Sequence, residues 1–296
     1  MAGNSPIEHL RVPVEGATLH VARSGTGAPL LLLHGWPEAG FTWHPVMARL
    51  AGQFTLIAPD LRGFGDSDKP AGPFGPAEQV ADVVALIDRL VPGPVGLVAH
   101  DVGASVAQAL ARSRPELVAG LFLFNFVYPG IGDRFNEPGH LPKVWHTYFN
   151  QSDLAPHLLR ASPDGIRMYV THWLDTWAHR KDAFDPATID TFVRTMEQPG
   201  NLEGGFTWYR SVAEQRAREA AGAMPPPIAL PTCVRWTECD AALPFAWTDR
   251  LGEFFTDLDF APFPGAGHFP HHEAPDRAAA EIAGFFGRLE RRGQPA

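Results

Sequence analysis

The stretch Val95–Ala111, VGLVAHDVGASVAQALA, decides the fold that this sequence predicts. It begins with an apolar run too short for a buried helix and continues from Ala104 with the composition of a helix, so the chain has to reverse direction in between. Asp101 lies at this reversal, and the small residues Ala99 and Gly103 flank it two positions away on each side. A sharp strand-to-helix turn needs such neighbours and lifts the side chain at its tip out of the fold. We interpret Asp101 as an exposed reactive group; the alternative is that it only caps the following helix.

An aspartate at the tip of such a turn restricts the chemistry. Carboxylate attack on an ester or amide yields only a labile anhydride, whereas attack on a saturated carbon that carries a leaving group yields an ester that water can later cleave. Epoxides and alkyl halides are substrates of the second kind. Asp101 therefore favours displacement at carbon over acyl transfer.

Short apolar runs alternate with helical patterns along most of the chain. The expected strands are two between Val12 and Val21, then Leu30–Leu33, Phe54–Ala58, Val95–Ala99, Leu121–Phe124, Cys233–Trp236 and Leu258–Phe263; the expected helices are Phe41–Leu50, Pro76–Leu90, Val102–Arg112 and Glu273–Arg288. This alternation predicts the α/β class, with a mostly parallel central sheet flanked by helices. Polar residues follow several strands, at His34, Asp60 and Asp101, and ligands bind at that carboxyl edge of such sheets.

The alternation stops after Tyr128 and resumes after three consecutive prolines at 225–227. We expect residues 1–127 and 228–296 to form the core domain and residues 128–227 to form an inserted helical cap, or lid. The expected lid is rich in Trp, Tyr and Phe, and an aromatic underside would exclude water from an apolar pocket. The alternative is that these aromatic residues only form the core of a small helical subdomain.

The composition limits the classes of binding partner that we expect and indicates the cellular compartment. The 296 residues are 45% hydrophobic, enough for a large core, and the net charge of −9 comes without a long basic run, so neither nucleic acid nor a membrane surface is an expected partner. The start of the sequence has no apolar stretch of signal-peptide length, which predicts a cytoplasmic protein. Cys233 and Cys239 lie too far apart on one expected strand to form a disulfide. No pattern indicates a metal or another cofactor.

Five short motifs follow one another along the chain. They are His34–Pro37 (HGWP), Asp60–Ser67 (DLRGFGDS), His100–Gly103 (HDVG), Trp236–Asp240 (WTECD) and Gly265–Phe269 (GAGHF). With these five motifs in this order, the sequence resembles the α/β-hydrolase fold family over almost its whole length. Within that family it resembles the branch of epoxide hydrolases and haloalkane dehalogenases. The resemblance implies that Asp101 is the nucleophile, His268 the base and Asp240 the acid that orients the base. It also implies that Trp36 and Val102 give backbone N–H groups to an oxyanion hole.

The residues themselves support two of these roles. His268 lies in a glycine-rich loop after the expected strand Leu258–Phe263, so it shares the carboxyl edge of the sheet with Asp101; the alternative is an ordinary loop histidine. Asp240 follows the expected strand Cys233–Trp236, again at this edge of the sheet; the alternative is that it caps a following helix. Glu238 is the rival acid, but we expect its side chain to point to the other face.

Some relatives place the acid after the preceding strand, where this chain has Asn125. An amide cannot be a charged partner for an imidazolium, but it could hold water or a substrate oxygen, so we assign Asn125 to substrate binding. His271 and His272 follow His268 closely, but no spaced cluster completes a metal site with them.

Epoxide and halide substrates differ in the leaving group. An epoxide oxygen leaves as a basic alkoxide and needs an acidic donor, whereas a halide needs only stabilising N–H groups. Haloalkane dehalogenases commonly carry a Trp directly after the nucleophile, and fluoroacetate dehalogenases carry two Arg nearby and a His-Trp pair in the lid. This chain has Val102, Ser105 and the pair His146-Thr147 instead, which favours an epoxide.

The epoxide branch grips the oxygen with lid residues, commonly two Tyr or a His and a Tyr. Tyr209 lies on the apolar stripe of the expected helix Phe206–Ala217, and His172 lies at the border of the stripe of Ile166–His179. We assign both to catalysis, and His146 to substrate binding. The alternatives are a purely structural Tyr209 and an ordinary surface or core His172.

The sequence thus predicts a hydrolase that needs no cofactor and opens small apolar epoxides with water through a covalent aspartyl ester. A dehalogenase that uses the same aspartate is the second hypothesis. A ligand-binding protein without turnover is the third, and the presence of Asp101, Asp240 and His268 together argues against it. The oligomeric state stays open, with a homodimer as one alternative.

Overall fold

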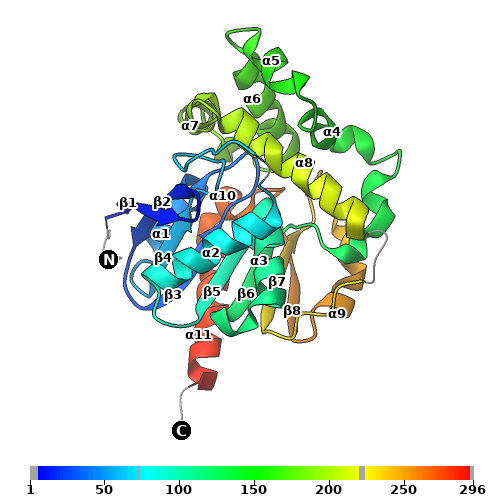
Figure 1. Cartoon of the computed structure of the whole chain (residues 1–296). Helices are drawn as coiled ribbons and strands as arrows, with labels where there is room; N and C mark the ends of the chain where they lie inside the picture. The colour runs from blue at the N-terminus through cyan, green and yellow to red at the C-terminus, as the bar shows by residue number, and fades with distance from the viewer. Residues whose placement is uncertain (1–5, 73, 220–223, 294–296) are drawn as a thin grey trace.

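The computed structural model describes residues 6–72, 74–219 and 224–293, and the strands within them form one sheet in the order β1-β2-β4-β3-β5-β6-β7-β8 (Figure 1). The strands are β1 (Glu8–Val14), β2 (Ala17–Ser24), β3 (Ala28–Leu33), β4 (Phe54–Pro59), β5 (Val95–His100), β6 (Val118–Phe124), β7 (Thr232–Thr237) and β8 (Leu258–Phe263). Strand β2 is antiparallel to β1 and to β4, and all other neighbours are parallel. The carboxyl ends of β3 to β8 therefore lie along one edge of the sheet.

The central strands are apolar along most of their length because helices cover both faces of the sheet. Every residue of β5 is buried, and so are the four leucines Leu30–Leu33 of β3. Parallel strands in this position need continuous apolar runs rather than alternation. The predicted α/β class with a mostly parallel sheet is confirmed.

The covering helices pack in pairs. Helices α2 (Pro76–Leu90) and α3 (Asp101–Ser113) contact each other over one face, and α1 (His44–Leu50) and α11 (Pro275–Gly293) contact each other over the opposite face (Figure 1). Helix α3 has Ala104, Ala107 and Ala111 buried. Such small side chains let the helix approach the sheet closely, which fixes the start of α3 against the carboxyl ends of the strands.

Five α-helices and three short 3-10 helices lie among the described residues between Tyr128 and Ile228, and none of these residues is in a strand. The 3-10 helices are η3 (Pro129–Asn136), η4 (Leu141–Lys143) and η5 (Lys181–Ala183). The α-helices are α4 (His146–Phe149), α5 (Leu154–Arg160), α6 (Gly165–Trp177), α7 (Pro186–Glu197) and α8 (Asn201–Glu219). Figure 1 shows them gathered above the carboxyl edge of the sheet. Trp173, Phe192 and Phe206 are almost completely buried, so much of the aromatic content packs inside this segment.

The end of the chain differs from the prediction of one helix over Glu273–Arg288. A short helix, α10 (Pro270–Glu273), ends before Ala274, whose φ of −140° is not helical, and α11 begins at Pro275. The residue before a proline is biased away from the helical conformation, which explains the break. Another short helix, α9 (Leu251–Phe254), precedes β8. None of the described helices combines the length and the apolar composition that crossing a membrane requires.

Candidate active site

Asp101 lies at the turn from β5 to α3 in a backbone conformation that few residues adopt. Its φ is +46°, in the left-handed region, where aspartate is among the better tolerated non-glycine residues. The N–H of Asp101 donates to the carbonyl of Asn125 at 3.1 Å, and the N–H of Gly103 donates to the carbonyl of His34 at 2.9 Å. A Cβ atom on Gly103 would collide with the backbone of Leu33, so this position requires glycine. The sharp strand-to-helix turn that the sequence predicts is present.

The carboxylate of Asp101 faces the loop after β3 and not the N-terminus of its own helix. Its Oδ2 accepts the backbone N–H of Trp36 at 3.0 Å. The N-cap of α3 is His100, which makes no side-chain capping bond. The first N–H groups of a helix have no partner within that helix, so α3 itself does not use the N–H of Val102. The interpretation of Asp101 as only a helix cap is not supported.

His268 and Asp240 meet at the same edge of the sheet. His268 Nδ1 lies 2.8 Å from Asp240 Oδ2, and both side chains are buried. The other oxygen of Asp240 accepts the N–H groups of Ala242 at 2.7 Å and Leu243 at 2.9 Å, which fixes the carboxylate. Glu238 is exposed. The structure thus brings Asp240, and not Glu238, to the imidazole.

The environment of His268 favours its charged form. Burial lowers the pKa of the imidazole, but the charge and hydrogen bond of Asp240, followed by the charge of Asp101, outweigh burial and raise the pKa to about 9. The contribution from Asp101 depends on its negative charge. A reaction that converts Asp101 into a neutral ester would therefore lower the pKa of His268 and make it a more available base.

Asn125 does not line the cavity beside Asp101. Its side-chain NH₂ donates to Thr237 Oγ1 and to Asp240 Oδ2, both at 2.7 Å, and its Oδ1 accepts the N–H of Thr237 at 2.9 Å. The amide lies completely buried behind Asp240. This placement differs from the expected contact with substrate, because the sequence does not show that β7 brings Thr237 and Asp240 to the amide.

A cavity opens in front of Asp101, between the carboxyl edge of the sheet and the helices above it. Its empty volume, open mouth included, is about 670 Å³. Its walls are mainly apolar, with a few polar groups, and include Asp101, Val102, Ser105, Phe135, Val144, His146, Thr147, Gln151, Trp177, Trp208, Tyr209, Val212, Leu243 and His268. No Lys or Arg is among the described lining residues. The cavity fits a small, mostly apolar and uncharged molecule.

The structure pairs Tyr209 with His146 and leaves His172 outside. The ring of Tyr209 lies 5.4 Å from the ring of His146, and both residues line the cavity. His172 is exposed on α6 and contacts Trp145 and Trp173 instead. The side chain of His172, at the border of the apolar stripe, points to solvent because Trp173 and Trp177 occupy the buried side of the helix.

His146 lies in an aromatic enclosure. Its ring is stacked on Trp36 with the centroids 5.1 Å apart and the planes at 9°, and Trp173 and Trp177 each lie 4.7 Å away. Burial, and to a smaller degree the charge of His268, hold the pKa of His146 well below its usual value. His146 is therefore neutral at physiological pH and carries a single N–H that it can donate.

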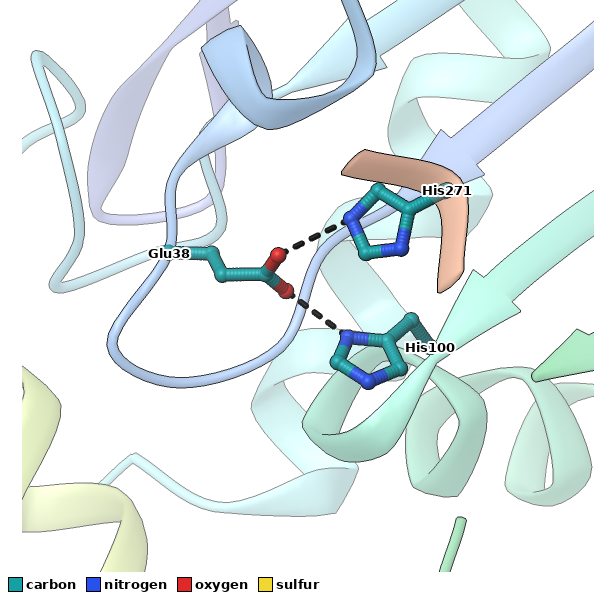
Figure 2. A group of neighbouring side chains, drawn as sticks. All are labelled: Glu38, His100 and His271. Carbon is teal, nitrogen blue, oxygen red and sulfur yellow. Dashed lines mark hydrogen bonds and ion pairs between the residues drawn. The ribbon is translucent and has the colours of Figure 1, made fainter. Parts of the chain in front are cut away.

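A second polar cluster lies behind the loop that holds Trp36. Figure 2 shows the carboxylate of Glu38 between two imidazoles, with His100 Nδ1 at 2.8 Å and His271 Nε2 at 2.9 Å. Glu38 also accepts the N–H of Gly35 at 2.8 Å and the hydroxyl of Thr42 at 2.8 Å. Gly35, Thr42, His100 and His271 thus all contact the one carboxylate of Glu38. These contacts hold the loop after β3 next to Asp101.

The sequence alone does not reveal this cluster. The spacing of His271 in the sequence completes no metal site. The available signal is that His100 belongs to the motif HDVG and Glu38 directly follows the motif HGWP. Only the fold brings α10 against them.

Comparisons with known proteins show which proteins this chain resembles. Residues 30–281 match the Alpha/beta hydrolase family. The chain is 36% identical over 213 residues to a soluble epoxide hydrolase of Corynebacterium sp. (strain C12), which covers 70% of this chain and 73% of that protein. It is 27% identical over 296 residues to a fluoroacetate dehalogenase of Burkholderia sp., which covers 94% and 93% of the two chains. The solved structure of the epoxide hydrolase CorEH without ligand superposes with a TM-score of 0.83 at 28% identity, over 96% of this chain and all of that one.

Proposed function

This chain belongs to the alpha/beta hydrolase family, and we propose that it is an epoxide hydrolase that converts small apolar epoxides to vicinal diols. The observation that carries the proposal is the carboxylate of Asp101, held at a sharp turn in an apolar cavity that also contains Tyr209 and His146. A carboxylate nucleophile suits a saturated carbon, the tyrosine can supply a proton to an oxygen leaving group, and the neutral imidazole can supply a hydrogen bond.

In the first step, one oxygen of Asp101 attacks an epoxide carbon, and the bond from that carbon to the epoxide oxygen breaks. The oxygen leaves with the electron pair and takes the hydroxyl proton of Tyr209, while the N–H of neutral His146 can donate a hydrogen bond to it. The product is a hydroxyalkyl ester of Asp101. The N–H of Trp36 already binds Asp101 Oδ2, which supports its role, with Val102, in holding the carboxylate oxygen that does not attack.

In the second step, His268 removes a proton from water, and the hydroxide attacks the acyl carbon of the ester. The oxyanion that forms is stabilised by the N–H groups of Trp36 and Val102. Its collapse breaks the bond between the acyl carbon and the alcohol oxygen, which takes the proton held by His268 and leaves as the diol. The proton of the carboxylic acid then passes through solvent to the deprotonated Tyr209, which restores Asp101 as a carboxylate. Asp240 orients His268 and stabilises its imidazolium form. The loss of negative charge on Asp101 during the first step lowers the pKa of His268 when the base is needed.

Residues 128–227 act as the lid in this proposal. Their helices contribute Tyr209 and His146 to the cavity, whereas Asp101 and His268 come from the sheet side. A lid in this position excludes water until the ester has formed and places the proton donors on the far side of the substrate from the nucleophile.

A dehalogenase is the second candidate, favoured by the likeness to the fluoroacetate dehalogenase over almost the whole chain. The cavity argues against a carboxylate-bearing substrate such as fluoroacetate, because its described lining includes no Lys or Arg that could bind the carboxylate. Val102 and Ser105 stand where such a cation would be expected.

A substrate panel tests the proposal. The purified protein is incubated with neutral alkyl and aryl epoxides and, separately, with haloalkanes and fluoroacetate. We expect diol from the epoxides and little free halide. Halide release without diol would replace the proposal with the dehalogenase, and the absence of both, with Asp101 unmodified, would favour a protein that only binds ligands.

The role of Asp240 as the acid that orients His268 can be tested against Glu238, which lies two positions away. Asp240→Asn keeps an oxygen for the N–H groups of Ala242 and Leu243 but removes the charge beside His268, so we expect turnover to fall by about 10²- to 10⁴-fold. Glu238→Gln changes an exposed side chain and should have little effect. Steady-state kinetics with an accepted epoxide compares the two variants, and the opposite ranking would move the acid to Glu238.

A further inference from the structure

Three histidines from three different elements gather at the edge of the sheet, away from the cavity. His9 of β1 and His20 of β2 have stacked rings with centroids 5.1 Å apart, and His9 Nδ1 lies 2.8 Å from His20 Nε2. The strands pair His9 with Ala22 and Arg11 with His20, so the two imidazoles are diagonal neighbours on one face of the hairpin. The ring of His44, at the start of α1, lies 6.3 Å from that of His9.

The contact between His9 and His20 requires one hydrogen or one cation between two ring nitrogens. His20 uses its other nitrogen, Nδ1, to contact Asp60 Oδ2 at 2.9 Å. If Nδ1 carries the proton for Asp60, Nε2 of neutral His20 presents a lone pair toward His9. A carboxylate that orients one nitrogen of a histidine so that the other faces outward is the usual support of a metal-binding imidazole.

Asp60 is itself fixed and cannot turn away from His20. Its carboxylate is buried and accepts the N–H groups of Gly40 at 2.6 Å and Asp66 at 2.7 Å. The hydrogen bond from His20 to Asp60 raises the pKa of His20, so protons compete with a cation for the imidazole at low pH. The nearby cation Arg11 is paired with Asp68 at 2.8 Å.

The spacing of the two ring nitrogens of His9 and His20 suits a transition metal with a small adjustment. Two nitrogens bound to one tetrahedral zinc ion at about 2.0–2.1 Å lie about 3.3 Å apart, so His9 and His20 need to separate by only about 0.5 Å. His9 is exposed, which lets its ring move and lets an ion enter from solvent. His44 can supply a third nitrogen if its ring moves toward the pair, because its ring centroid lies 6.3 Å from that of His9 and its buried Nε2 makes no hydrogen bond within the described part of the chain.

The cluster of Glu38, His100 and His271 also has the composition of a metal site, but its geometry argues otherwise. Each imidazole nitrogen that faces Glu38 already shares a hydrogen bond with it, and all three side chains are fully buried (Figure 2). An ion from solution has no exposed ligand to meet there. On the hairpin, by contrast, His9 is exposed, and its ring nitrogen is hydrogen-bonded to a second imidazole and not to a carboxylate, so separating the two rings leaves no buried charge without a partner.

We propose that His9, His20 and His44 bind one divalent transition-metal ion of the zinc class, with Asp60 orienting His20. The ion would join the β1–β2 hairpin to α1. Imidazole ligands favour Zn²⁺, Cu²⁺ and Ni²⁺ over Mg²⁺ and Ca²⁺.

Zinc titration of the untagged full chain tests the proposal. Metal-free protein competes with a chromophoric chelator for Zn²⁺ at pH 7.5, and calorimetry gives the stoichiometry. We expect one equivalent of Zn²⁺ in the wild type, and a loss of affinity of about tenfold or more in His9→Gln, His20→Gln and His44→Gln. His157→Gln, which changes an exposed histidine on α5, is the control and should bind like the wild type.

Thermal unfolding separates loss of the site from loss of the fold. Zn²⁺ should raise the unfolding temperature of the wild type and of His157→Gln but not of His20→Gln, while the metal-free His20→Gln stays folded. Binding that is absent from the wild type, or that His9→Gln and His20→Gln leave unchanged, would overturn the proposal. Unchanged binding by His44→Gln would overturn the three-histidine site.

Discussion

Replacement of His268 by glutamine should trap the protein as an ester of its substrate. Without the imidazole no base at the site removes a proton from water, so the first step proceeds and the second fails. We expect steady-state turnover to fall by about 10³-fold or more. Intact-protein mass spectrometry after addition of an accepted epoxide should show a gain of one whole substrate mass, and peptide mapping should place it on Asp101.

The double variant His268→Gln with Asp101→Asn is the control for this experiment. Asparagine also tolerates the left-handed backbone conformation at position 101, but its amide is a poor nucleophile, so no adduct should form. In the wild type, turnover in water labelled with ¹⁸O should place the label in the carboxylate of Asp101, because water attacks its acyl carbon. An adduct that is missing from His268→Gln, or label that appears only in the diol after repeated turnover, would contradict the covalent mechanism.

The parts of the site that follow single strands could be predicted from the sequence. Asp101 could be placed because the apolar run before it, the helix after it and the small residues around it all require one sharp turn, and the positive φ agrees. The preference for Asp240 over Glu238 rested on which face of the chain each residue takes. The structure has Asp240 buried against His268 and Glu238 exposed.

The parts of the site that depend on packing between distant elements could not be predicted. His172 and His146 both lie in helical, aromatic sequence, and only the packing of α6 against α4 turns the first to solvent and the second into the cavity. Asn125 looked like a substrate contact because the sequence does not reveal that its amide is used by Thr237 and Asp240. Long-range contacts of this kind leave no local pattern.

The cluster around Glu38 also depends on contacts between elements that are distant in the sequence. A buried carboxylate is costly unless several donors satisfy it, and here the donors come from the loop after β3, from His100 and from His271, more than 230 positions along the chain from Glu38. Burial works against ionisation of Glu38, but the two histidines outweigh it and hold its pKa well below its usual value. Each partner alone resembles an ordinary polar residue, and only the assembled set indicates a role in fixing the loop that carries Trp36.

Replacement of Tyr209 by phenylalanine should slow ring opening and leave ester hydrolysis intact. The phenyl ring keeps the contacts with Trp36 and His146 but removes the hydroxyl proton that the departing oxygen needs, so we expect alkylation to slow by about 10²- to 10⁴-fold. Rapid-mixing single-turnover measurements resolve the two steps. His146→Gln should slow the same step if both groups grip one oxygen, and the exposed His172→Gln is the matched control, with no expected change.

The leaving group decides whether the hydroxyl of Tyr209 acts as an acid or only shapes the cavity. A halide departs without a proton, so the deficit of Tyr209→Phe should shrink for any haloalkane that the protein accepts, whereas a purely structural defect would slow both substrates equally. Alkylation by an epoxide at the wild-type rate would exclude the hydroxyl as the essential proton donor and leave the N–H of His146 as a remaining hydrogen-bond donor from the lid. A deficit confined to haloalkanes would instead support the dehalogenase, because Tyr209 would then bind halide rather than protonate an alkoxide.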